Sequence, residues 1–351
     1  MCGLDALRGL AVFLMIEQHM GVWLWHGVGK GKMLASAWPL VAFNALGGGA
    51  APMFITLAGV GTALLARARP TGADGVLVRR GLVLLAFGYL LTAMTPSWFS
   101  WGSWFVLHLM GFAMATAVLW RRLSDRALVG LALAVMVGAI AVQTAIATPL
   151  QLTNELMRDS SRPGGALRLA FVESQFPILP WLGPFLLGMV AGRAIAAQAF
   201  GRIAWLGAAS IGLGGGGWVV AQLLAPAAKS FAGRAFAIHL GFFPASIAIV
   251  GLLVGAVLLV IAWVSWRDAR SPIADRHPMV VLGRASLTLL LVHVPLFREA
   301  TRPVGMWHGM GAGETLAIIA GFLLLAVFLC GQWQRVGYRG GAEWILRKLG
   351  G

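Results

Sequence analysis

Two ionisable side chains, Glu17 and His19, stand close together in the first apolar block of the chain, and His26 closes that block. A fourth candidate, His293, lies in an apolar block near the other end of the chain. Polar groups in hydrocarbon are costly and are usually retained for a function. An imidazole takes up and returns a proton near neutral pH, and a neighbouring carboxylate or imidazole can orient it. These four residues therefore suit proton transfer of the kind that general acid–base catalysis uses.

A single helix would place the first block's polar residues on defined faces. Arg8 and His19 are eleven positions apart, which is three helical turns plus about 20°, with a rise of ~16 Å. We therefore expect both on one face, with Arg8 at one membrane surface and His19 beyond the midplane. Asp5 precedes Arg8 by three residues and is placed to pair with it. Glu17 points about 180° away from Arg8 and needs a different partner.

The composition is that of a membrane protein. Of the 351 residues, 59% are hydrophobic and 11% are charged, whereas soluble domains carry about 25% charged residues. Apolar blocks long enough to cross a bilayer recur along the chain. They predict an all-α, polytopic bundle of about ten transmembrane helices in a single domain, 1–351, with spans near 6–26, 42–66, 79–96, 103–120, 127–147, 176–196, 202–224, 237–264, 280–297 and 314–333.

The charged residues orient this bundle. The formal net charge is +15, but the cations lie between apolar blocks and form no single basic surface, which argues against nucleic-acid binding. Alternate sides of the predicted spans hold 18 and 9 Lys and Arg residues. The positive-inside rule then places both termini in the cytoplasm. Cys2 and Cys330 have no metal-ligand spacing, and we expect neither a metal site nor a structural disulfide.

The histidines are distributed unevenly across this topology. Only His277 falls on the cytoplasmic side. The other six lie in the outer half of the membrane or at its outer surface: His19, His26, His108, His239, His293 and His308. For any one of them, interfacial solvation is an equally good explanation, but their shared side favours proton chemistry near the outer surface.

Several segments resemble the transmembrane acyltransferases, including the bacterial heparan-α-glucosaminide N-acetyltransferase-like proteins and the O-acyltransferases that modify surface polysaccharides. Leu4–Ala11 with His19 is similar to the opening of that group. Further similarities follow in the family's order over nearly the whole chain, at Pro52–Gly59, Arg79–Gly81, Phe176–Gly183 with Gly192 and Arg193, and Leu282–Leu287 with His293.

The resemblance implies transfer of an acyl group, usually acetyl, from cytoplasmic acyl-CoA to an amine or hydroxyl on the outer side, often of a sugar. It implies a catalytic His. His19 matches the polysaccharide-modifying branch. The glucosaminide branch typically has Asn there and a His in the following loop, for which His26 is the nearest candidate at a shorter spacing. We favour His19 and keep His26 open, with Glu17 or His293 as the group that orients the base.

The same resemblance implies a donor site at the cytoplasmic ends of the helices. Arginines there suit the CoA phosphates. The predicted donor-binding set is Asp5, Arg8, Arg79, Arg80, Arg284 and Ser286. For Arg79 and Arg80, simple anchoring of topology is at least as good an explanation.

Two other classes of function remain open. A proton-coupled transporter of a small solute or lipid precursor would also carry intramembrane Glu and His, although no internal repeat is evident. A non-catalytic membrane partner is the third. For an enzyme, we expect acetyl-CoA as donor substrate with no tightly bound cofactor, a glycan or amino-sugar acceptor, and a bacterial inner membrane. The acyl group, the acceptor and whether the chain forms a homodimer stay undetermined.

Overall fold

The computed structural model describes residues 2–28, 37–238 and 242–351. This part of the chain is helical, and its only bridge-type pairing joins Trp25 to Met310. It divides into two compact units, Met1–Phe54 with Arg267–Lys348, and Ile55–Trp266 with Leu349–Gly351. Each unit is described by itself.

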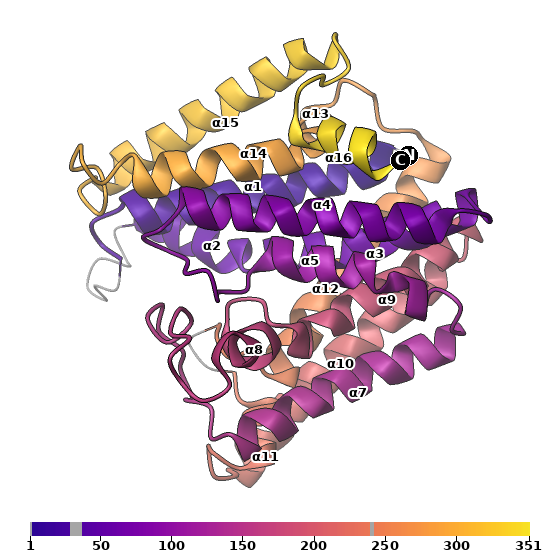
Figure 1. Ribbon diagram of the computed structural model, residues 1–351, viewed down its shortest axis with the longest axis vertical. Coiled ribbons are helices and arrows are strands. Elements are labelled where there is room, and N and C mark those ends of the chain that lie inside the picture. Colours follow the sequence, from indigo (N-terminus) through magenta and orange to yellow (C-terminus); the bar gives the residue numbers. More distant parts are fainter. Residues whose placement is uncertain (1, 29–36, 239–241) are drawn as a thin grey trace. The chain divides into compact units, whose positions relative to one another are not determined.

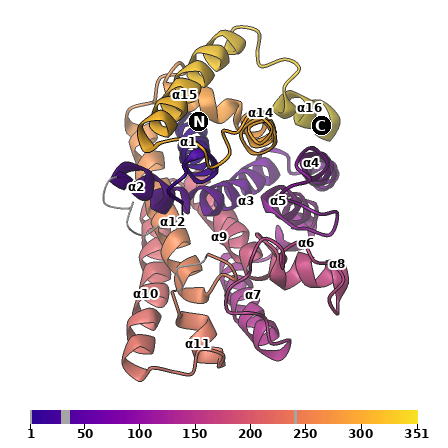
Figure 2. The same ribbon diagram turned by 90° about the vertical axis from the view of Figure 1, so that its left-hand side faces the viewer.

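The first unit is built around the N-terminal helix. Its elements are α1 (Cys2–Leu24), α2 (Trp38–Gly47), the start of α3 (Ala50–Ala68), α13 (Pro278–Arg284), α14 (Ser286–Val294), η4 (Pro295–Glu299), α15 (Ala312–Gln334) and most of α16 (Ala342–Gly350). Figures 1 and 2 show α14 and α15 alongside α1, which also packs against α2 and α13.

Glycines let α1 and α13 approach closely. A Cβ atom added to Gly9 would overlap the backbone of Met279, and one added to Gly283 would overlap the backbone carbonyl of Asp5. In a bilayer, small residues promote helix association because they let backbones meet. Because α14 follows α13 directly, this contact also fixes the position of α14 and of its His293.

The second unit contains the middle of the chain. Its elements are most of α3, then α4 (Ala73–Met94), α5 (Val106–Ala115), α6 (Ala117–Trp120), α7 (Asp125–Ala145), α8 (Gly165–Arg168), η3 (Leu169–Glu173), α9 (Ile178–Ala196), α10 (Phe200–Leu224), α11 (Phe231–Phe236) and most of α12 (Ile247–Arg270). The helices α4 and α5 approach closely at Gly81 and Gly111. In the same way α10 and α12, which lie side by side in Figure 2, approach closely at Gly207 and Gly255.

Seven described helices are long and apolar enough to cross a membrane, and the bent pair Pro278–Arg284 and Ser286–Glu299 makes an eighth if it is one span. They confirm a multi-pass, all-helical membrane protein. The seven correspond to predicted spans two, three, five to eight and ten. The remaining predicted spans fall on α1, on α5 with α6, and on the bent pair. The total of ten and the cytoplasmic termini stay predictions.

Two predicted spans differ from the helices in detail. The span predicted at 280–297 bends by 75° at Ala285. In the described part of the span predicted at 237–264, the helix α12 begins at Ile247, after Phe243 and Pro244, because proline disfavours a helix at and before its own position. His239, placed at the start of that span, lies outside the described residues.

Candidate active site

A pair of histidines joins α1 to α14. His19 Nδ1 lies 3.0 Å from His293 Nε2, and the two rings are stacked with centroids 5.3 Å apart. His293 is fully buried, while His19 is half-buried. The packing of α14 against α1 brings these residues together across 274 positions of sequence.

The hydrogen bonds of His293 determine the tautomer of both rings when they are neutral. His293 Nδ1 lies 2.8 Å from the backbone carbonyl of Leu289, which can only accept, so this nitrogen carries the proton. His293 Nε2 is then an acceptor, and His19 Nδ1 must be the donor in the bond between the rings. His19 Nε2 is thereby left with its lone pair, which is what a general base or acyl acceptor requires.

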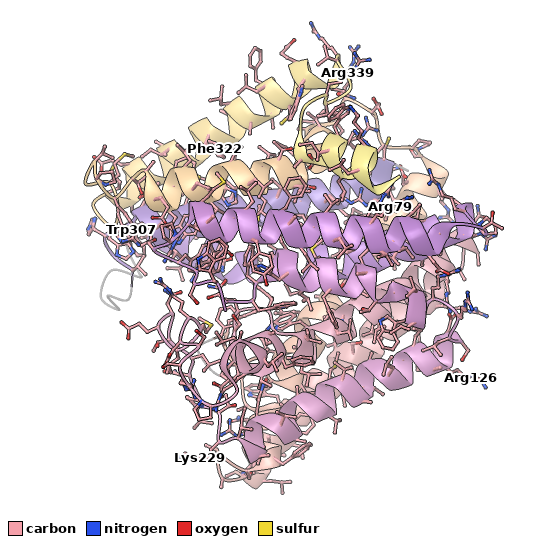
Figure 3. The ribbon with its side chains drawn as sticks, in the orientation of Figure 1. Arg79, Arg126, Lys229, Trp307, Phe322 and Arg339 are labelled. Carbon is pink, nitrogen blue, oxygen red and sulfur yellow. The ribbon has the colours of Figure 1, made fainter. Side chains whose placement is uncertain are left out.

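An aromatic column continues from His19 toward the loop after η4. Trp23, one helical turn after His19, stacks on it with centroids 4.7 Å apart. The ring centroid of Trp307 lies 6.4 Å from that of Trp23 and 4.8 Å from that of His308, and the rings in both pairs are nearly parallel. Figure 3 shows Trp307 at one end of α15.

Backbone hydrogen bonds hold the loop against the end of α1. His308 N–H donates to the Trp23 carbonyl at 2.8 Å, and Met310 N–H donates to the Leu24 carbonyl at 3.0 Å. His26 is part of the same connection, since its N–H and its Nδ1 both bond the Met310 carbonyl, at 3.0 and 2.7 Å. The loop is therefore fixed relative to His19.

Two arginines add positive charge to the column. The guanidinium carbon of Arg302 lies 3.8 Å from the Trp307 ring centroid, and that of Arg298 lies 5.0 Å from Trp307 and 5.6 Å from Trp23. Cations are attracted to indole faces. At His308, burial lowers the pKa, and the charges of Arg302 and Arg298 lower it further, against a hydrogen bond with the Val22 backbone that raises it.

The profile of the heparan-alpha-glucosaminide N-acetyltransferase catalytic domain matches residues 1–230. The chain belongs to this family. Membership supports a membrane acetyltransferase that acts on a glycan or amino sugar, and it confirms the resemblance noted from the sequence. A comparison with curated proteins found no match. The matched segment contains His19 and His26, whereas His293, Arg298 and Arg302 follow it.

The predicted catalytic residues of this family member occupy different positions. His293 contacts His19 directly. The side-chain bond of His26 runs to the loop at Met310. Glu17 is fully buried, and within the described residues neither carboxylate oxygen has a hydrogen-bond partner. It lies about 160° around the helix from His19, so His293, and not Glu17, is in position to orient that imidazole.

The predicted donor residues at the other end of α1 form a charge-balanced network. Arg284 bonds Asp5 at 3.1 Å and Asp275 at 2.6 Å, and Arg8 bonds Asp5 at 3.1 Å. The hydrogen bond from Arg284 holds the pKa of Asp275 below its usual value. Two carboxylates already offset Arg284, while Arg8 keeps 40% of its side chain exposed. Arg8 is therefore the better placed of the two for a phosphate.

The remaining donor candidates are held in other ways. Ser286 is the first residue of α14, whose N-terminal N–H groups at Leu287 and Thr288 donate to the Glu343 carboxylate. Arg79 and Arg80 belong to the second unit, where Arg79 is exposed and Arg80 donates to the Gly351 carbonyl at 3.2 Å.

Sequence reasoning missed the aromatic and cationic part of the site. The residues selected from the sequence did not include Trp23, Arg298 or Arg302. The four-residue spacing of His19 and Trp23 was a usable signal, because such residues stack along one helix face. Arg302 and Trp307 lie in a loop whose sequence has no periodicity, so no pattern in the sequence predicted their contact.

Proposed function

We propose that the protein transfers an acetyl group from acetyl-CoA, bound at the cytoplasmic end of α1, to an amine or hydroxyl of a sugar on the outer side of a bacterial inner membrane. The hydrogen bond between His19 and His293 carries the proposal, because it leaves His19 Nε2 as an oriented base in a family of acetyltransferases. Arg8 is the proposed contact for a donor phosphate.

The reaction balances with His19 as a proton carrier. His19 Nε2 takes the proton of the acceptor amine or hydroxyl as that group attacks the thioester carbonyl. The carbon–sulfur bond breaks, and the imidazolium returns the proton to the departing CoA thiolate. A two-step route is also compatible with this arrangement. His19 Nε2 attacks the thioester and CoA leaves as the thiolate. The acceptor then attacks the acetyl carbon, the bond to Nε2 breaks, and the acceptor proton passes to Nε2 and from there to the thiolate. His293 accepts from His19 Nδ1 throughout and steadies the imidazolium.

The decisive experiment measures acetyl transfer from labelled acetyl-CoA to glucosamine by the purified protein in detergent. His19→Ala should abolish turnover while leaving acetyl-CoA binding intact. His26→Ala should keep most of the activity, because its ring is bonded to the loop.

Loss of activity in His26→Ala alone would move the base to the loop and contradict the role of His19. Absence of acetyl-CoA binding at millimolar concentration would contradict the enzyme as a whole and favour proton-coupled transport, which buried Glu17 would suit.

A further inference from the structure

Arg302 is held in one orientation beside the proposed active site. Its Nε donates to the Arg298 carbonyl at 3.0 Å, and its guanidinium carbon lies over the Trp307 ring, 3.8 Å from the ring centroid. These two contacts use the Nε–H and one face of the guanidinium. The side chain is exposed, so its terminal N–H groups are accessible. A fixed guanidinium loses little entropy when it binds a planar or tetrahedral anion with two parallel hydrogen bonds.

Arg298 places a second positive charge on the same aromatic ring. Arg298 is only 8% exposed, and its guanidinium carbon lies 5.0 Å from the Trp307 ring centroid and 5.6 Å from that of Trp23. Two like charges at one indole repel each other. An anion bound at Arg302 would relieve that repulsion and would be attracted by both charges.

The arginine pair is connected to the base by stacked rings. Trp23 lies between His19, at 4.7 Å, and Trp307, at 6.4 Å. The loop that carries both Trp307 and Arg302 is bonded to the end of α1, so this spacing is fixed.

We propose that Arg302, assisted by Arg298, recognises an anionic group of the acceptor sugar, a carboxylate, phosphate or sulfate, and so determines which sugars reach His19. The inference rests on the proposed function. It assigns specificity to residues 298–307, which follow the segment matched by the family profile.

The test compares neutral and anionic acceptors in nanodiscs of zwitterionic lipid. The KM for glucosamine 6-phosphate or 6-sulfate should be at least about tenfold lower than for glucosamine, and the difference should shrink at high salt. Arg302→Gln should abolish the difference by raising the KM for the anionic sugars, with kcat and the KM for acetyl-CoA unchanged. Arg302→Lys should restore part of it.

Arg339→Gln is the matched control. Arg339 is an exposed arginine just beyond the far end of α15 from Trp307, as Figure 3 shows, and its substitution should leave every KM unchanged. Equal KM values for neutral and anionic sugars in the wild-type protein would overturn the inference.

Binding without the donor separates this inference from the reaction. Calorimetric titration of glucosamine 6-phosphate should show binding that Arg302→Gln removes, even if no acetyl transfer is found. Binding without transfer would contradict the proposed function and support the inference. Arg302-dependent retention of phosphatidylglycerol, without binding of the anionic sugar, would assign the arginines to a lipid headgroup and overturn it.

Discussion

The carbonyl of Leu289 determines what His19 can do, because it fixes the proton of His293 on Nδ1. Replacing His293 by Ala removes the acceptor for His19 Nδ1–H, so that either ring nitrogen of His19 can carry the proton. We expect kcat to fall about 100-fold, with the KM for acetyl-CoA unchanged.

His293→Gln is the conservative control, because its amide oxygen can reach the position of the imidazole Nε2. This variant should recover part of kcat, and its pH profile should resemble that of the wild-type protein more closely than that of the Ala variant. Equal kcat values for the two variants would contradict a positioning role for His293.

A second residue-scale prediction concerns Glu173 in the second unit. It is fully buried, forms ion pairs with Arg162 at 2.6 Å and Arg168 at 2.8 Å, and accepts a hydrogen bond from the Thr148 hydroxyl at 2.7 Å. Burial raises its pKa, but the hydrogen bonds from Arg168 and Thr148 and the two positive charges outweigh burial, so the net pKa is lowered below 4.5. A depressed carboxylate pKa stabilises the fold above the unfolded-state value, and this stabilisation is lost as pH falls through the folded-state value.

Glu173→Gln should therefore lower the unfolding temperature at neutral pH, because it leaves two arginines without their carboxylate. Its unfolding temperature should change less than that of the wild-type protein as pH falls from 5 toward 3. Thermal unfolding in detergent, followed by intrinsic fluorescence, measures both effects. An unfolding temperature at pH 7 equal to that of the wild-type protein would show that the network contributes nothing to stability.

At this scale the sequence predicted the residues that share a helix and missed those that meet through loops. Arg8, Glu17 and His19 could be placed on faces of α1 because helical geometry is regular. The stacking of Arg302 on Trp307 depends on a loop whose backbone follows no period. The charge balance around Arg284 depends on Asp275, which no motif or spacing in the chain singled out.

At the scale of helices, the contact between α1 and α13 fixes the position of α14, which carries His293. Gly9→Ala or Gly283→Ala would force a methyl group into backbone atoms and separate the helices. We expect a loss of about 1–3 kcal/mol in stability and a drop in activity, because α14 follows α13 directly. Thermal unfolding and acetyl transfer measure the two effects.

Gly138→Ala in α7 is the control for helix propensity. A Cβ there meets no atom within 4 Å, so this change should be neutral or slightly stabilising. If Gly9→Ala behaved like Gly138→Ala, close approach of α1 and α13 would not be needed.

The bend between α13 and α14 illustrates what a hydropathy pattern cannot contain. Residues 280–297 form one apolar block, and the pattern predicts one straight span. In the structure the block breaks at Ala285, and the N–H groups in the first turn of α14 donate to the carboxylate of Glu343 from α16, more than fifty residues later. A helix break that is stabilised by a carboxylate far along the chain leaves no signal in the hydropathy of the block itself.

At the scale of the whole molecule, composition predicted the class of protein. The number of spans was harder to predict, because some helices are only weakly apolar. The α1 helix has 23 residues, yet it carries Glu17, Gln18 and His19 and is not among the seven helices that are long and apolar enough to cross a membrane. The helices that carry the proposed chemistry, α1 and the bent pair, are the ones that simple hydropathy identifies least clearly. This follows from the polar residues and breaks that a site in a membrane requires.

The proposed reaction requires opposite ends of α1 to face opposite sides of the membrane, and labelling can test this. In a protein whose two cysteines have been replaced, Glu155→Cys reports on the loop between α7 and α9, and Arg276→Cys reports on the loop before α13; both positions are exposed. An impermeant maleimide should label position 155 in intact cells and position 276 only after permeabilisation. The 18-to-9 distribution of Lys and Arg is the physical reason. The reverse pattern would place Arg8 outside, away from cytoplasmic acetyl-CoA, and would contradict transfer from the cytoplasm to the outer side.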